Sequence, residues 1–181
     1  MDSFEAIIAL FLQEKGYWVR SSVKVDISKA DKRKIGTHSM PRPEIDLVAY
    51  NLKANELLLI EAKSFLDSYG VKYKSLSKNR NDGGYKLLTS RTFRRIVSQK
   101  LKKHYVEIGL INKTTKINYA LVAGNVYSHD ENKIADLFKR KGWKFFSPSE
   151  IREGIKALSN KGWEDNAITL TTKLILRGVT Q

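Results

Sequence analysis

The sequence predicts an α/β fold in which one mixed β-sheet is flanked by helices on both faces. Two apolar segments, 45–50 and 57–62, lie on either side of a short polar stretch, as in a β-hairpin. Apolar residues recur with helical spacing near the N-terminus and again from about residue 90. A third strand-like run follows at 117–126. Strands and helices therefore mix along one chain, which favours a sheet covered by helices.

The first part of the chain is expected to form a helix, a strand and the hairpin. Ser3 can cap a helix that runs to about Lys15, and Gly16 ends it. The remaining expectations for this part are a strand at 17–27, a basic loop at 28–43, and hairpin strands at 43–50 and 57–63 joined by a turn at 51–55.

The second part of the chain is expected to begin with a polar loop at about 65–86. Thr89 or Ser90 can then cap a long helix that ends near Ile108. Ser147 can cap a helix that opens with Pro148. The other elements expected here are a strand at 117–126, a helix at 130–141, a short strand at 143–146 and a last helix from about Glu164 to Arg177.

Length and composition indicate one domain. The 181 residues can bury a single core, expected at about 1–125, with a helical C-terminal extension at about 130–181. The absence of cysteine excludes disulfides and thiolate metal sites. No apolar run approaches the roughly 20 residues of a membrane-spanning helix, and the N-terminus lacks a signal-peptide pattern. The expected location is the cytoplasm.

The positive charge of the chain is concentrated in two segments. The net charge is +14, and residues 65–105 hold eleven Lys or Arg against two Asp. Residues 29–43 hold five Lys or Arg against Asp31. Charge clustered in this way favours a polyanionic partner over a merely solubilising surface.

Three ionisable residues interrupt the apolar hairpin strands. If Asn51 pairs with Glu56, Asp46 lies opposite Glu61, and Lys63 shares their face. Two carboxylates about 5 Å apart repel one another unless a cation lies between them, and such oxygen ligands suit Mg²⁺ or Mn²⁺. The alternative is a surface hairpin with an ordinary cross-strand salt bridge. The apolar neighbours on both strands disfavour that alternative.

These strands resemble the signature of the PD-(D/E)XK nuclease superfamily. Asp46 matches the acidic residue of the second core strand, and Glu61-Ala62-Lys63 matches (D/E)-X-K in the third. The resemblance covers about residues 1–125. Pro43 departs from the pattern because it lies three residues before Asp46. Glu44 follows that proline directly, so it could replace or assist Asp46.

The resemblance implies a restriction-endonuclease-like fold and a Mg²⁺-dependent DNA endonuclease in which Mn²⁺ is expected to substitute for Mg²⁺. It implies that Asp46 and Glu61 bind the metal, that Glu5 of the first helix adds a third carboxylate, and that Lys63 supports the reaction at the phosphate. Many members of the superfamily act as homodimers, which is also an expectation here. The alternatives are a nucleic-acid-binding protein on the same fold that does not cut, and a basic RNA-associated protein.

Basic residues after the hairpin are the expected DNA contacts. Cations can bind phosphates, and the interleaved Tyr69, Tyr73 and Tyr85 could stack on exposed bases or pack in the loop. The predicted nucleic-acid-binding residues are Lys72, Lys74, Lys78, Arg80, Arg91, Arg94 and Arg95.

Overall fold

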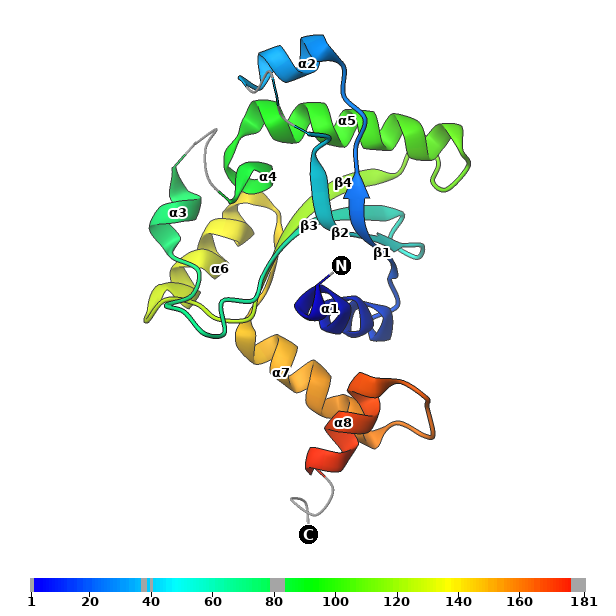
Figure 1. Ribbon diagram of the computed structural model, residues 1–181, viewed down its shortest axis with the longest axis vertical. Helices are drawn as coiled ribbons and strands as arrows, with labels where there is room; N and C mark the ends of the chain where they lie inside the picture. Colours follow the sequence, from blue (N-terminus) through cyan, green and yellow to red (C-terminus); the bar gives the residue numbers. More distant parts are fainter. Residues whose placement is uncertain (1, 37–38, 40, 79–83, 177–181) are drawn as a thin grey trace.

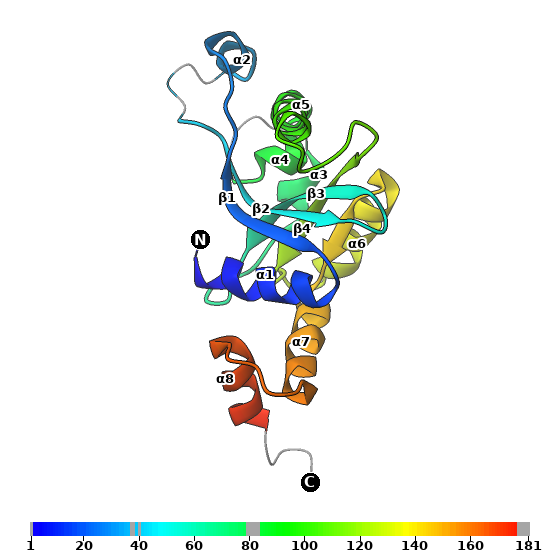
Figure 2. The ribbon, with the colours of Figure 1, turned by 90° about the vertical axis from the view of Figure 1, so that its right-hand side faces the viewer.

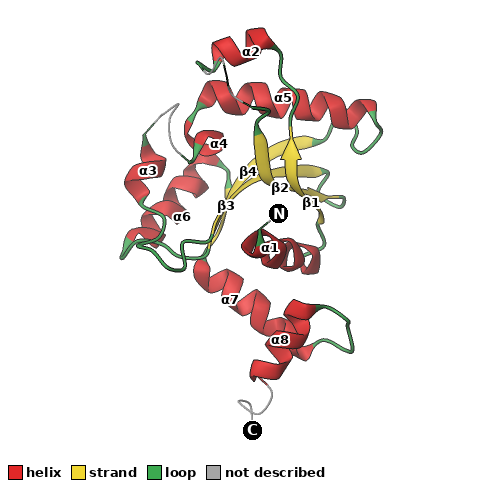
Figure 3. Cartoon of the chain, viewed as in Figure 1, coloured by secondary structure: helices red, strands yellow, loops and turns green. Residues whose placement is uncertain are grey.

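A computed structural model describes residues 2–36, 39, 41–78 and 84–176. Within these residues, five strands form one mixed sheet in the order β1-β2-β3-β4-β5 (Figures 1 and 3). The first three strands form an antiparallel meander, β4 runs parallel to β3, and β5 runs parallel to β4. The strands are β1 (Trp18–Lys24), β2 (Glu44–Asn51), β3 (Glu56–Lys63), β4 (Lys116–Ala123) and β5 (Lys144–Phe146).

Helices cover both faces of the sheet, as predicted. Figure 2 shows α5 on one side of the strands and α1 on the other. Side chains of α3, α4 and α6 pack on the α5 side, and those of α7 pack on the α1 side. The helices are α1 (Ser3–Glu14), α2 (Lys29–Lys34), α3 (Tyr73–Ser77), α4 (Lys86–Thr89), α5 (Arg91–Glu107), α6 (Asp130–Lys141), α7 (Pro148–Ala157) and α8 (Ala167–Leu176), with a 3-10 turn η1 (Leu158–Asn160).

The apolar residues of β3 divide between two cores because strand side chains alternate. Leu58 and Ile60 pack against α1, whereas Leu57 and Leu59 pack under α5. All four are buried. This two-sided burial explains why the strand reads as a nearly continuous apolar run, and it places any polar residue at the strand's end close to the interior.

Several element boundaries differ from the sequence expectation. The N-cap of α1 is Asp2 rather than Ser3, since the Asp2 side chain accepts the N–H of Glu5. The basic loop at 28–43 contains α2, which opens with a capping box between Ser28 and Asp31. The polar loop at 65–86 likewise contains α3 and the start of α4. Helix α5 is capped by Ser90, one of the two candidates.

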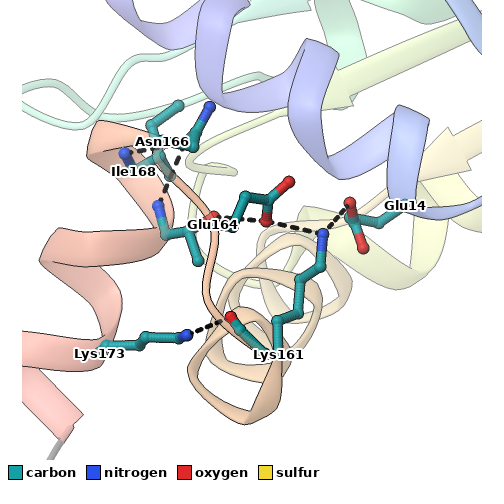
Figure 4. Close-up of polar contacts among 8 residues, drawn as sticks. Glu14, Lys161, Glu164, Asn166, Ile168 and Lys173 are labelled. Carbon is teal, nitrogen blue, oxygen red and sulfur yellow. Dashed lines mark hydrogen bonds and ion pairs between the residues drawn. The ribbon is translucent and has the colours of Figure 1, made fainter.

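The segment after residue 125 is more than a helical extension, because it supplies strand β5 to the sheet. Its end is tied to the N-terminal helix. The Lys161 ammonium lies 2.8 Å from carboxylate oxygens of both Glu14 and Glu164 (Figure 4). The Asn166 side chain accepts the N–H groups of Ile168 and Thr169, so α8 begins later than the expected residue 164. No helix in the described part of the chain is long and apolar enough to cross a bilayer.

Candidate active site

The hairpin register brings Asp46 and Glu61 to the same place. Strands β2 and β3 pair from Asn51–Glu56 to Leu47–Ile60, which is the register that the sequence predicted. Its continuation places Asp46 beside Glu61. There the Asp46 Oδ2 atom accepts a 2.8 Å hydrogen bond from the backbone N–H of Ala62. The carboxylate is therefore fixed by the backbone of the neighbouring strand.

Lys63 lies between the two carboxylates. Its Nζ atom is 2.6 Å from Glu61 Oε1 and 3.8 Å from Asp46 Oδ2. The three side chains are only 14–26% exposed. The structure thus joins the three residues that the sequence singled out, in a partly buried cluster and not in a surface salt bridge.

Burial sets the charge state of this cluster. It raises the pKa of Glu61 to about 7, helped by nearby Asp46 and opposed by Lys63. Burial also raises the pKa of Asp46, although the Ala62 N–H and Lys63 oppose the shift. For Lys63, the two carboxylates outweigh the effect of burial and raise the pKa. When Glu61 ionises near neutral pH, two carboxylates face one ammonium, so the cluster carries a net negative charge.

Glu5 reaches this cluster from the first turn of α1. Burial raises its pKa, and the negative charges of Asp2 and Asp46 raise it further. The hydroxyl of Ser22 donates a 3.5 Å hydrogen bond to Glu5 Oε2. The interaction between Glu5 and Asp46 is consistent with a shared site, and the role predicted for Glu5 stays a prediction.

Ser22 is a member of the site that sequence reasoning missed. It lies on β1 between the register pairs Ser21–Leu47 and Val23–Ile45, and so directly across from Asp46. Its φ is +51°, which is costly for a residue with a Cβ atom. Ile45 packs in the α5-side core and Leu47 in the α1-side core, so the alternation of β2 breaks at Asp46.

The Tyr85 side chain packs next to the cluster and is therefore not positioned to stack on a nucleobase. Its ring centroid is 5.8 Å from the Lys63 Nζ atom, and the ring packs with the apolar cluster around α3, α4 and α6. Burial, with the negative charge of Glu61, raises the pKa of Tyr85 to about 12. The tyrosine stays neutral and restricts the space around the lysine.

The alternative carboxylate, Glu44, lies further out. Glu44 is exposed and pairs across the strands with Lys24, whereas Asp46 is partly buried and contacts Lys63. The geometry therefore favours Asp46 over Glu44 as the inner carboxylate.

The donor set suits a hard divalent cation. Among the described residues, no group of three or more His, Asp or Glu side chains is close enough together to hold a metal. Asp46 and Glu61 nevertheless form a partly buried carboxylate pair, which carries an excess of negative charge when both are ionised, and Glu5 is electrostatically coupled to it. Oxygen donors of this kind fit Mg²⁺ or Mn²⁺. A cation between the two carboxylates would require the Lys63 ammonium to move aside.

The predicted nucleic-acid-binding residues fall into three groups. Lys72, Lys74, Lys78, Arg91 and Arg95 are exposed. Arg94 points inward, where it donates to the carbonyls of Leu87 and Leu88 and stacks 4.6 Å from the Trp143 ring. Arg80 lies outside the described residues. The five exposed cations are accessible to a ligand, although Lys72 also contacts two tyrosine rings, whereas Arg94 is held inside the fold by its carbonyl and ring contacts.

Comparison of the chain with known protein families, with characterised proteins and with solved structures gives no match.

Proposed function

We propose that this protein is a metal-dependent nuclease of the PD-(D/E)XK superfamily that hydrolyses phosphodiester bonds in DNA. The observation that carries the proposal is the convergence of Asp46, Glu61 and Lys63 in a partly buried cluster at the end of an apolar hairpin. The order of α1, the β1–β3 meander, α5 and β4 supports it, because the core of the superfamily consists of a helix, a three-strand meander, a helix and a fourth strand in this order.

The chain's own residues have distinct roles in this proposal. Asp46 and Glu61 would hold the divalent cation, and Glu5 is the candidate for a third carboxylate. A bound Mg²⁺ supplies charge stabilisation at the phosphate and makes a coordinated water more acidic. The Lys63 ammonium, released from Glu61, stabilises negative charge that develops on the scissile phosphate or orients the attacking water. The Tyr85 ring, 5.8 Å from the Lys63 Nζ atom, limits the space into which the ammonium can move.

The second candidate is a nucleic-acid-binding protein on the same fold that does not cut. The observation that favours it is the 2.6 Å contact between Lys63 and Glu61, since such a pair can neutralise itself without metal. The raised pKa of Glu61 weighs against it, because a stable structural ion pair lowers the pKa of its carboxylate.

The test is incubation of the purified protein with supercoiled, linear, branched and single-stranded DNA, with and without Mg²⁺. We expect Mg²⁺-dependent cleavage of at least one form, lost in Asp46→Asn and in Glu61→Gln. DNA binding without cleavage of any form, under Mg²⁺ or Mn²⁺, would favour the second candidate. Sedimentation of the protein with and without DNA tests the expected homodimer.

A further inference from the structure

An exposed aromatic pair lies on the two segments that follow the C-terminal ends of β3 and β4, and Lys63 is the last residue of β3. Strands β3 and β4 are parallel and end together, with Lys63 paired to Ala123. The segments that follow them run side by side at the foot of α3 and α6 (Figure 1) and are joined by a parallel bridge between Val71 and Val126. Tyr69 lies on the first segment and Tyr127 on the second.

The rings of Tyr69 and Tyr127 pack edge to face with the Lys72 ammonium over both, and this group is called the platform below. Their centroids are 6.4 Å apart at an interplanar angle of 67°. The Lys72 Nζ atom lies 5.8 Å from the Tyr69 ring and 5.0 Å from the Tyr127 ring. Tyr69 is 79% exposed and Tyr127 is 42% exposed. Aromatic rings that are open to solvent next to a cation can stack on nucleobases.

The backbone holds the platform in place. The Val71 N–H donates to the Asn125 carbonyl at 3.0 Å, and the Tyr127 N–H donates to the Val71 carbonyl at 2.9 Å. Gly70 has φ +82°, and a Cβ atom there would lie 2.7 Å from the Val126 backbone. Only glycine permits this close approach of the two segments. The rings are therefore presented by a fixed support, which reduces the entropy lost when a ligand binds.

The other tyrosines of the β3–α5 connection are placed differently. Tyr73 and Tyr85 pack against the apolar cluster of α3, α4 and α6, so the exposure of Tyr69 is not a general property of this segment. Lys74 and Lys78, which follow the platform in sequence, are exposed. Aromatic faces next to the Lys72 ammonium match the two parts of a nucleotide, namely the base and the phosphate.

We infer that Tyr69, Lys72 and Tyr127 form a stacking site for unpaired nucleobases, and that the substrate carries a single-stranded segment next to the scissile phosphate. Bases inside a duplex are stacked on one another and offer no free face, so only an unpaired base can use this platform. The choice of substrate class rests on the proposed nuclease function. The stacking itself does not.

The test measures binding without cleavage. Glu61→Gln protein in EDTA is titrated by fluorescence anisotropy with labelled dT20, labelled rU20 and a blunt duplex of equal length. In this background, Tyr69→Leu and Tyr127→Leu should each weaken single-strand binding between about 5-fold and 100-fold, with duplex binding changed less than about twofold. Weaker binding of either single strand supports the inference. Whichever of dT20 and rU20 loses more affinity shows whether the site prefers DNA or RNA.

Two controls separate stacking from other causes. Tyr69→Phe keeps the ring and should bind within about twofold of the parent, whereas loss equal to that of Tyr69→Leu would overturn stacking. Trp163→Leu removes an exposed ring, 88% accessible, between η1 and α8 and should have no effect. Equal single-strand affinity in all variants would overturn the inference, and the remaining candidate ligand for the platform would be a protein. If ring-dependent binding persists but no DNA or RNA is cleaved with Mg²⁺, the proposed function has failed and the stacking site has not.

Discussion

Replacement of Glu61 by glutamine should stabilise the metal-free protein at pH 8 and have little effect at pH 4.5. Burial raises the folded-state pKa of Glu61 from 4.5 to about 7. Between these values the folded protein binds more protons than the unfolded chain, so its stability falls as the pH rises from about 4.5 to about 7. Above pH 7 the cost is fully present and amounts to about 3 kcal/mol. Glutamine resembles the protonated acid and avoids this cost.

The assay is urea unfolding of the wild type and Glu61→Gln in EDTA at pH 4.5 and pH 8. Titrating groups that do not interact with Glu61 contribute equally to both proteins and cancel in the difference. At pH 8 the variant should be more stable by up to about 3 kcal/mol, or roughly 6–12 °C in Tm. If the variant is less stable than the wild type at pH 8, Glu61 and Lys63 form a stabilising ion pair, and the reasoning from burial is wrong.

Three further predictions concern the lysine, the metal and the basic surface. Lys63→Met should slow cleavage about 100- to 1,000-fold with DNA affinity changed only a few fold. The same substitution should move the midpoint of Mg²⁺ binding to higher pH, because Lys63 lowers the pKa of Glu61. Single-turnover rates measure the cleavage step, and calorimetry measures Mg²⁺ binding. Mn²⁺ binding to the wild type should release a proton near pH 6, seen as a heat that depends on the ionisation enthalpy of the buffer. Neutralising Arg91 and Arg95 together should reduce the slope of log K against log salt for duplex DNA by up to about 1.8, whereas Arg94→Gln should lower Tm instead.

Much of the hairpin could be predicted from its sequence. The polar turn at 51–55 and the apolar runs beside it set one register, because a slip by one residue would turn each apolar set to the opposite face. That register brings Asp46 to Glu61, and the period of two brings Lys63 to the same cluster. The convergence of these three residues therefore follows from local rules.

The rest of the site depends on tertiary structure. The positive φ of Ser22 and the break in alternation at Asp46 have no local signal, because serine has no strong preference for that conformation. In the sequence, Arg94 looks like one of several surface cations. Its side chain turns inward because Trp143, from a distant segment, lies next to it. The pairing of Tyr69 with Tyr127 likewise requires the parallel approach of two connections. The short helix α2 is different, since its Ser28–Asp31 capping box is visible in the sequence.

The most direct test of the central claim compares two carboxylates of β2 and β3 in one cleavage assay. Glu61 is partly buried in the proposed metal site, whereas Glu44 is exposed at the start of its strand and serves as the matched control. With Mg²⁺ at pH 8, the wild type and Glu44→Gln should cleave DNA at rates within a few fold of each other. Glu61→Gln should be at least about 100-fold slower. Cleavage by Glu61→Gln at the wild-type rate would contradict the account.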